Sequence, residues 1–452
     1  MTLPPLSDLL CADGDARIVA GPDGRNRYGR TAAPSPDLAF GSSTASAISE
    51  GAWRAVAARR DLWLSDPRAP RDVFAHGADA VRARFAALYG LRDTAMILTP
   101  SGTDAHLLAA LLLAGPHDAP LLSLCVEPAE TGSGAPLALA ARRFGGAGEI
   151  LSYGDRAETL SVAARDGDGH VRPAAEVMAE LDAAIAAAAR AGRRALLVVA
   201  DVSKTGLIAP DADTVRDLMA RWGARLDVLV DACQLRLSPE SLRGWLDLGC
   251  LLALTGSKFV GGPAFSGMLL APEAVARRLR HRTLPRLPEL GHAALWPDGW
   301  AARAACAAAP AFGLLARWEA ALYEMEAFFA CGDARLTRAT QALSDAFAAR
   351  LAASPVLRPL PAPPLKRARA GWDGIAGILS FTPAAPCPPG VQLGQPVRIG
   401  ADSALRLCLS MPLIARAARD DAGMQAVLRD GDSVIAALEK AAATVAPDRR
   451  AG

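Results

Sequence analysis

The stretch DACQLRLSPESLRGWLDLGCLLALTGSKFVGGPAFSG, residues 231–267, contains the two residues on which the predicted fold depends. Asp231 ends one β-like run, and a second run at 251–257 ends at Lys258 among small residues. The chain has only four lysines, at positions 204, 258, 366 and 440, among 49 lysines and arginines. Arginine keeps its proton, whereas a desolvated lysine can lose it and become a nucleophilic amine. Lys258 is therefore a candidate nucleophile.

Short β-like runs alternate with helical stretches from about residue 76 to residue 275. The runs cover residues 95–100, 120–128, 149–154, 195–203, 226–234, 251–257 and 267–272. Nearly continuous apolar strands separated by helices are typical of a parallel sheet covered on both faces. The pattern predicts an α/β fold with a mostly parallel seven-stranded sheet flanked by helices, and a smaller C-terminal α+β domain.

Changes in sequence character divide the chain into four expected segments. Residues 1–75 are turn-rich with little periodicity, which predicts an extended N-terminal arm. The alternating pattern places a large ligand-binding domain at 76–300. A connecting helix is expected at 301–335, and a small domain at 336–452.

Within the small domain we expect two strands and a final helix. The apolar runs at 374–383 and 404–413 predict the strands. Residues 421–446 predict the helix.

Composition excludes several classes of function. A net charge of +2 does not suggest a nucleic-acid partner, and no run approaches eighteen apolar residues, so no membrane span is expected. The first residues lack the pattern of a signal peptide. Eight scattered cysteines without a CxxC pair favour reduced thiols and a cytoplasmic location. The six histidines show no metal-ligand spacing, so no metal is expected.

Polar residues follow the ends of several predicted strands, and in open α/β sheets ligands bind at the carboxyl ends of strands. These residues are Ser101, Thr103, Glu130, Ser203, Asp231 and Lys258. Ser101, Gly102 and Thr103 should begin a helix, whose free N–H groups and dipole favour a phosphate. The alternative is an ordinary helix N-cap, which Ser or Thr supplies in any protein.

A carboxylate followed by a lysine on the next strand suits pyridoxal 5'-phosphate (PLP). The lysine amine condenses with the aldehyde as a Schiff base, and the carboxylate keeps the pyridine nitrogen protonated. Here the chain resembles the fold-type-I PLP enzymes, and most of all the class V aminotransferase group, which includes cysteine desulfurases and kynureninases. VDACQ (230–234) resembles the family's Asp-x-x-Gln, TGSKFVGGPAFSGMLL (255–270) its lysine segment, and TPSGTDA (99–105) its phosphate-binding turn.

The resemblance covers residues 76–275 well and the C-terminal domain more loosely, and it implies roles for individual residues. Lys258 and Asp231 would be catalytic, and Arg406 would bind the substrate carboxylate, although a surface salt bridge is the alternative for Arg406. The resemblance also implies a homodimer in which the N-terminal arm crosses to the partner. The residues expected to bind PLP are Ser101, Gly102, Thr103, Thr131, Ser203, Asp231, Gln234, Thr255, Ser257 and Lys258.

The sequence departs from the family at three places. Ser257 stands where relatives usually have a histidine. The loop after residue 128 has no aromatic residue to cover the pyridine ring, and Glu130 or Thr131 occupies the expected region. Either the ring is covered differently, or another residue such as His106 takes that role. Lys204 replaces the usual asparagine. It is either a surface lysine or a second catalytic amine or cation beside the substrate.

Three functions follow from these residues. The first is an aminotransferase that acts on an amino acid or amino-acid-like substrate through an external aldimine. The second is a PLP-dependent β- or γ-elimination or substitution enzyme of specialised metabolism, which Lys204 and the missing ring-covering histidine favour. The third is a non-catalytic scaffold, which should have lost Lys258 or Asp231. A desulfurase is disfavoured, because Cys387 is the only loop-like candidate for the nucleophilic cysteine.

Overall fold

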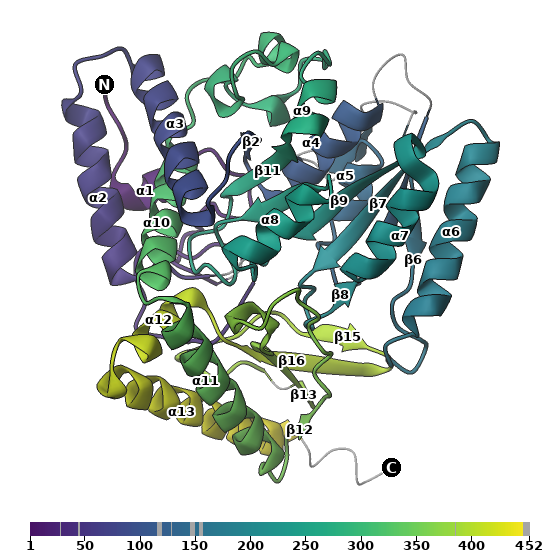
Figure 1. The fold of residues 1–452 in the computed structure, drawn as a ribbon. Coiled ribbons are helices and arrows are strands. Elements are labelled where there is room, and N and C mark those ends of the chain that lie inside the picture. Colours follow the sequence, from purple (N-terminus) through teal and green to yellow (C-terminus); the bar gives the residue numbers. More distant parts are fainter. Residues whose placement is uncertain are drawn as a thin grey trace.

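The computed structural model describes residues 1–27, 29–43, 46–114, 120–127, 129–144, 150–152, 157–384 and 386–445. A twisted central sheet lies at its centre (Figure 1). In spatial order the strands are β2 (Thr94–Thr99), β11 (Gly267–Pro272), β10 (Leu251–Thr255), β9 (Leu226–Ala232), β7 (Arg194–Asp201), β3 (Leu121–Val126) and β6 (Ala157–Val162), with β8 (Ile208–Ala209) paired to β7. β11 is antiparallel to both β10 and β2, and β8 is antiparallel to β7, whereas the other pairs in this order are parallel. The predicted α/β fold with a mostly parallel sheet is confirmed.

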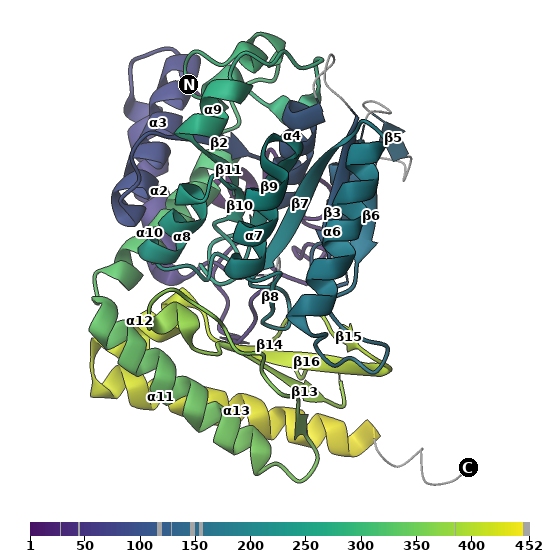
Figure 2. The same cartoon turned by 45° about the vertical axis from the view of Figure 1, so that its right-hand side comes forward.

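Helices cover both faces of this sheet, which explains why its central strands are almost continuously apolar. Every residue of β9 is buried, as expected for a central strand between two helical layers. α6 (Ala174–Arg190), α7 (Ala212–Trp222) and α8 (Pro239–Asp247) contact one face (Figure 2). α4 (Gly102–Ala114) lies on the other face and is buried along almost its whole length.

One predicted strand belongs to a different sheet. In the run at 149–154, residues 149, 153 and 154 lie outside the described residues, and β5 (Ile150–Ser152) pairs with β4 (Arg142–Phe144) as a separate ribbon. β6 takes the edge position beside β3 instead. β6 is partly exposed and carries Glu158, Thr159 and Ser161, so it lacks the continuous apolar signal of a buried strand.

The expectation of an extended arm over residues 1–75 is wrong for residues 50–65. These form α2 (Glu50–Ser65), which begins where the Ser49 hydroxyl accepts a hydrogen bond from the backbone N–H of Ala52. α2 packs against α10 (Phe312–Phe329). The buried residues of α2 are Ala52, Val56 and Trp63, which are widely spaced. The helical periodicity of apolar residues in this segment is therefore weak. α1 (Leu6–Cys11) and α3 (Pro70–Tyr89) also contact α10.

A smaller antiparallel sheet lies below the central one (Figure 2). Its strands follow the order β12 (Arg358–Pro359), β13 (Ile378–Thr382), β16 (Asp402–Cys408) and β15 (Val397–Ile399). α11 (Asp333–Ala352), α12 (Met411–Arg419) and α13 (Asp421–Val445) complete this part. The predicted strand at 404–413 therefore ends early, because residues 411–413 begin α12.

The N-terminal segment joins the C-terminal part of the chain through a separate two-stranded sheet. β1 (Leu38–Ala39) pairs in parallel with β14 (Val391–Gln392), which places residues 40–43 beside the carboxyl ends of the central strands. In the described part of the chain, no helix has the length and apolar character that a membrane span requires.

Candidate active site

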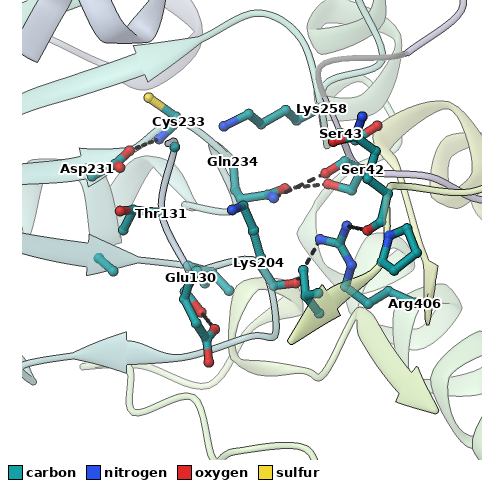
Figure 3. Close-up of a pocket in the computed structure, with 17 residues that line it drawn as sticks. Ser42, Ser43, Glu130, Thr131, Lys204, Asp231, Cys233, Gln234, Lys258 and Arg406 are labelled. Carbon is teal, nitrogen blue, oxygen red and sulfur yellow. Dashed lines mark hydrogen bonds between the residues drawn. The ribbon is translucent and has the colours of Figure 1, made fainter. Parts of the chain in front are cut away.

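The carboxyl ends of β7 and β9 open into a pocket that the N-terminal segment and the lower sheet close (Figure 3). An adjoining pocket shares Lys204, Asp231 and Lys258 with it and extends to the N-terminus of α4. Together the two pockets contain every site residue that the sequence predicted. The first is lined by Thr131, Ser203, Lys204, Asp231, Gln234, Lys258 and Arg406. The second adds Ser101, Gly102, Thr103, Thr255 and Ser257.

Lys258 projects into this space from a tight turn after β10 (Figure 3). Its backbone φ is 61°, in the left-handed region that residues other than glycine seldom adopt. The Ser46 hydroxyl accepts a hydrogen bond of 3.1 Å from the Lys258 backbone N–H. A side chain at Gly262 would overlap the carbonyl oxygen of Gly256, so the turn requires glycine there. Strained backbone of this kind is concentrated at functional sites.

Asp231 lies near the end of β9 and is held from two sides. Its Oδ1 accepts a hydrogen bond of 3.1 Å from the backbone N–H of Cys233. Its Oδ2 lies 3.5 Å from Nε2 of His106, a buried residue of α4. Burial acts to raise the pKa of Asp231, but His106 and then Lys258 outweigh it and hold that pKa well below its usual range.

The protonation of His106 follows from its second contact. Nδ1 lies 2.7 Å from the carbonyl oxygen of Gly102, which can only accept, so Nδ1 carries a proton. Nε2 then faces a carboxylate, which favours a proton there as well. Burial lowers the pKa of His106, but Asp231 and the Gly102 carbonyl raise it by more. His106 and Asp231 thus form a buried ion pair.

Ser101 acts as the cap of α4. Its hydroxyl accepts a hydrogen bond of 3.3 Å from the backbone N–H of Asp104 and donates one of 2.7 Å to the Asp104 carboxylate. Ser101 is therefore an ordinary helix N-cap, which was the alternative to a phosphate-binding role. Gly102 and Thr103 of the first turn line the adjoining pocket, where the N–H groups of a helix N-terminus can bind an anion.

The start of α4 approaches the β9 and β10 ends closely. A Cβ atom at Gly102 would lie 2.5 Å from Sγ of Cys233 and 3.1 Å from Cγ2 of Thr255. The Thr255 hydroxyl donates to the Cys233 carbonyl oxygen at 2.8 Å and lies 3.1 Å from the Ser257 hydroxyl. These contacts bring a small hydroxyl cluster to the helix N-terminus.

Glu130 is buried in the wall of the first pocket. Its carboxylate accepts hydrogen bonds from the hydroxyls of Ser203 and Thr205, from the Thr205 backbone N–H and from Nε of Arg165. This network fixes the loop after β3 against the loop after β7. The Ser203 hydroxyl is therefore already engaged by Glu130.

Arg406 reaches the pocket from β16 and is 3% exposed. Its Nη1 and Nη2 donate to the backbone carbonyl oxygens of Lys204 (3.2 Å) and Gln395 (2.6 Å). Its Nε is buried and has no hydrogen-bond partner among the described residues. A surface salt bridge, the alternative for Arg406, is wrong because the guanidinium is buried and held by backbone carbonyls.

Several pocket residues were missed by sequence reasoning. Ser42 binds both ends of the Gln234 amide: its hydroxyl donates to Oε1, and its carbonyl oxygen accepts from Nε2 at 3.1 Å. Ser43 and Gln395 line the same pocket. Arg17 lines the adjoining one, with its guanidinium 4.8 Å from the centre of the Phe265 ring. No periodic signal marks them, because each reaches the site from an irregular segment.

Neither a family model nor a curated protein matches this sequence. Solved structures do resemble the chain. The fold is similar to that of C-DES, a cystine C-S lyase in complex with its reaction product cysteine persulfide, with a TM-score of 0.57 over 88% of this chain and 98% of that chain, at 17% identity. The chain has the fold of the type I PLP enzymes.

Other type I structures agree with this assignment. The cysteine desulfurase CsdA from Escherichia coli gives a TM-score of 0.56 at 14% identity, over 89% of this chain and 95% of that chain. TDC from Oryza sativa, solved with PLP and tryptamine, gives 0.52 at 14% identity, over 89% and 84%. The resemblance drawn from the sequence is thus confirmed for the fold.

Proposed function

We propose that the protein binds PLP through Lys258 and acts on an amino acid as a lyase that eliminates a group from the substrate side chain. The observation that carries the proposal is that Lys258 and Asp231 line one pocket at the carboxyl ends of adjacent strands of a type I fold. The C–S lyase named among the similar structures supports elimination as the reaction.

The described residues fit the parts of PLP. The buried anion of Asp231 is suited to hold a proton on the pyridine nitrogen, and Lys258 offers the amine for the aldehyde. Thr103, Ser257 and the first turn of α4 offer donors for the phosphate. Gly102 lacks the Cβ that would crowd the cofactor end of β9. The two pockets therefore offer hydroxyl and N–H groups for the phosphate, an amine for the aldehyde and a carboxylate for the pyridine nitrogen.

When bound, PLP supplies an electron sink for the chemistry at the substrate Cα. The Lys258 amine is placed to take the Cα proton and to return it to substrate or product. Arg406 would orient the substrate through its carboxylate, using Nε and the N–H groups not given to backbone carbonyls. Glu130 and its partners keep the pocket wall rigid, so these groups stay in place.

Elimination by Lys258 is favoured over desulfuration by a cysteine. Among the described residues that line the two pockets, Cys233 is the one that carries a thiol. Burial and the Asp231 carboxylate raise the pKa of Cys233 well above its ordinary value, so it stays a thiol instead of a nucleophilic thiolate. Transamination, the first function predicted from the sequence, uses the same groups and is the second candidate.

Two measurements test this proposal. First, the protein is loaded with PLP, reduced with borohydride and digested, and the modified peptide should contain Lys258. Lys258→Ala should abolish the modification, whereas the exposed control Lys440→Ala should keep it. Attachment to another lysine would overturn the proposal.

Second, the loaded protein receives single amino acids without a keto acid. Elimination should release the protonated side-chain group, a keto acid and ammonia in equal amounts over many turnovers. Transamination should instead stop after one equivalent per site and resume when a keto acid is added, which would make the second candidate correct.

A further inference from the structure

Three cationic side chains line the first pocket. Lys204, Lys258 and Arg406 all line it, from the loop after β7, the turn after β10 and strand β16 (Figure 3). Its lining includes two carboxylates, Glu130 and Asp231. Whether the positive charge of Lys204 is neutralised within the protein depends on whether either carboxylate pairs with it.

Both carboxylates have partners of their own. Glu130 is bound by Arg165, Ser203 and Thr205, and the network includes the Arg165 guanidinium as its counter-ion. Asp231 is paired with His106. Among the described residues neither carboxylate forms an ion pair with Lys204, so within this part of the chain its ammonium lines the pocket without a salt bridge.

The ammonium of Lys204 has spare hydrogen-bonding capacity. Among the residues that the structure describes, Nζ donates one hydrogen bond, to the carbonyl oxygen of Ala129 at 3.2 Å. An ammonium has three N–H donors, so two remain. Burial, and then the charges of Lys258 and Arg406, lower the pKa of Lys204, and they outweigh the opposite action of the Glu130 and Asp231 carboxylates. An anion bound between these cations would reverse that destabilisation.

The proposed function leaves Lys204 without a task. It assigns Lys258 to PLP, Arg406 to the substrate carboxylate, and the α4 end to the phosphate. The Lys204 backbone carbonyl accepts from Arg406, so the two cations lie on adjacent parts of the pocket wall. A substrate held by Arg406 would therefore lie in the pocket that Lys204 also lines.

We infer that Lys204 binds a second acidic group, and that the substrate is an amino acid with an anionic side chain. The inference rests on the proposed function, because it takes Arg406 as the site of the first carboxylate. Lys204 would then be a specificity residue, which selects acidic over neutral substrates of the same length. A carboxylate, sulfinate or phosphate would share the required charge.

Equilibrium binding tests the inference without measuring turnover. The PLP-loaded protein is titrated calorimetrically with succinate and with butyrate, which share a four-carbon chain but differ by one carboxylate. Succinate should bind about tenfold or more tightly, as expected for one charge-assisted contact. Lys204→Gln should remove this preference while butyrate affinity stays unchanged. Lys204→Arg should retain it, as should the exposed control Lys440→Gln.

The inference would be overturned by equal binding of both acids by the unmodified protein, or by a succinate preference that survives Lys204→Gln. A Lys204→Gln protein that loses both acids equally would also overturn it, because the lysine would then support the pocket as a whole. These results are distinct from failure of the proposed function, which would appear as PLP that does not attach to Lys258.

Discussion

The buried pair of His106 and Asp231 yields a prediction that separates charge from hydrogen bonding. In His106→Asn the new amide nitrogen should occupy the place of Nδ1 and keep the contact with the Gly102 carbonyl. It cannot reach Asp231, which then stays buried without its cation. In the matched variant His106→Gln the longer amide should reach Asp231 as a neutral donor.

The size of the effect follows from the geometry. Removing one partner of a buried ion pair costs about 3–5 kcal/mol of unfolding free energy. The separation of 3.5 Å is longer than a good charged hydrogen bond, and the Cys233 backbone N–H still binds Asp231. We therefore expect the low end, about 3 kcal/mol, for His106→Asn, and about half of that for His106→Gln.

The loss should depend on pH in a defined direction. Folding raises the pKa of His106. The stabilisation that His106 contributes is therefore complete below about pH 6.5 and is lost as the pH rises through the pKa of the folded state. Folding lowers the pKa of Asp231. The stabilisation that Asp231 contributes is therefore complete above about pH 3.9 and is lost as the pH falls through the pKa of the folded state. The full penalty of His106→Asn thus belongs between about pH 4 and 6.5.

Urea unfolding of the protein without PLP, followed by tryptophan fluorescence, measures this penalty. The urea midpoints of the variants are compared at pH 5.5 and at pH 9, and the comparison requires that the unfolding free energy falls with urea concentration at the same slope in each variant. The difference between the natural protein and His106→Asn should shrink at the higher pH, and His106→Gln should respond less to pH. A penalty that is the same at both pH values, or below about 1 kcal/mol at pH 5.5, would refute the charged pair.

Four further predictions concern the site and the assembly. Asp231→Ala should still attach PLP to Lys258 but lose most turnover, because an unprotonated pyridine is a poor electron sink; near-normal turnover would place the acidic partner elsewhere. Gly102→Ala should cost about 1–3 kcal/mol of stability and weaken PLP binding, since its Cβ meets Cys233; unchanged PLP affinity in a fluorescence titration would contradict this. Arg406→Lys should raise KM for the amino acid about tenfold with a smaller change in kcat, because lysine cannot form the bidentate fork; an unchanged KM would remove Arg406 from substrate binding. Light scattering should report a homodimer, and a stable, active monomer would reject it.

Local sequence was sufficient for the centre of the fold. Asp231 and Lys258 each follow an apolar run, and parallel neighbouring strands bring their carboxyl ends to one edge of a sheet. Their proximity therefore follows from strand order alone. The same local pattern was insufficient where a strand lies at an exposed edge, as in β6, or where a helix buries only a few well-spaced residues, as in α2.

Tertiary structure decided how the pocket is completed. Ser42 meets Gln234, and Arg406 meets the Lys204 carbonyl, across separations of 192 and 202 residues. No local propensity encodes such contacts, because they depend on how the N-terminal segment and the lower sheet pack onto the central one. Residue type and position along the chain were enough to identify the side chains that could do the chemistry. Only the packing of distant segments determined that Glu130 and Asp231 are bound to Arg165 and His106, which leaves the Lys204 ammonium without a salt bridge among the residues that the structure describes.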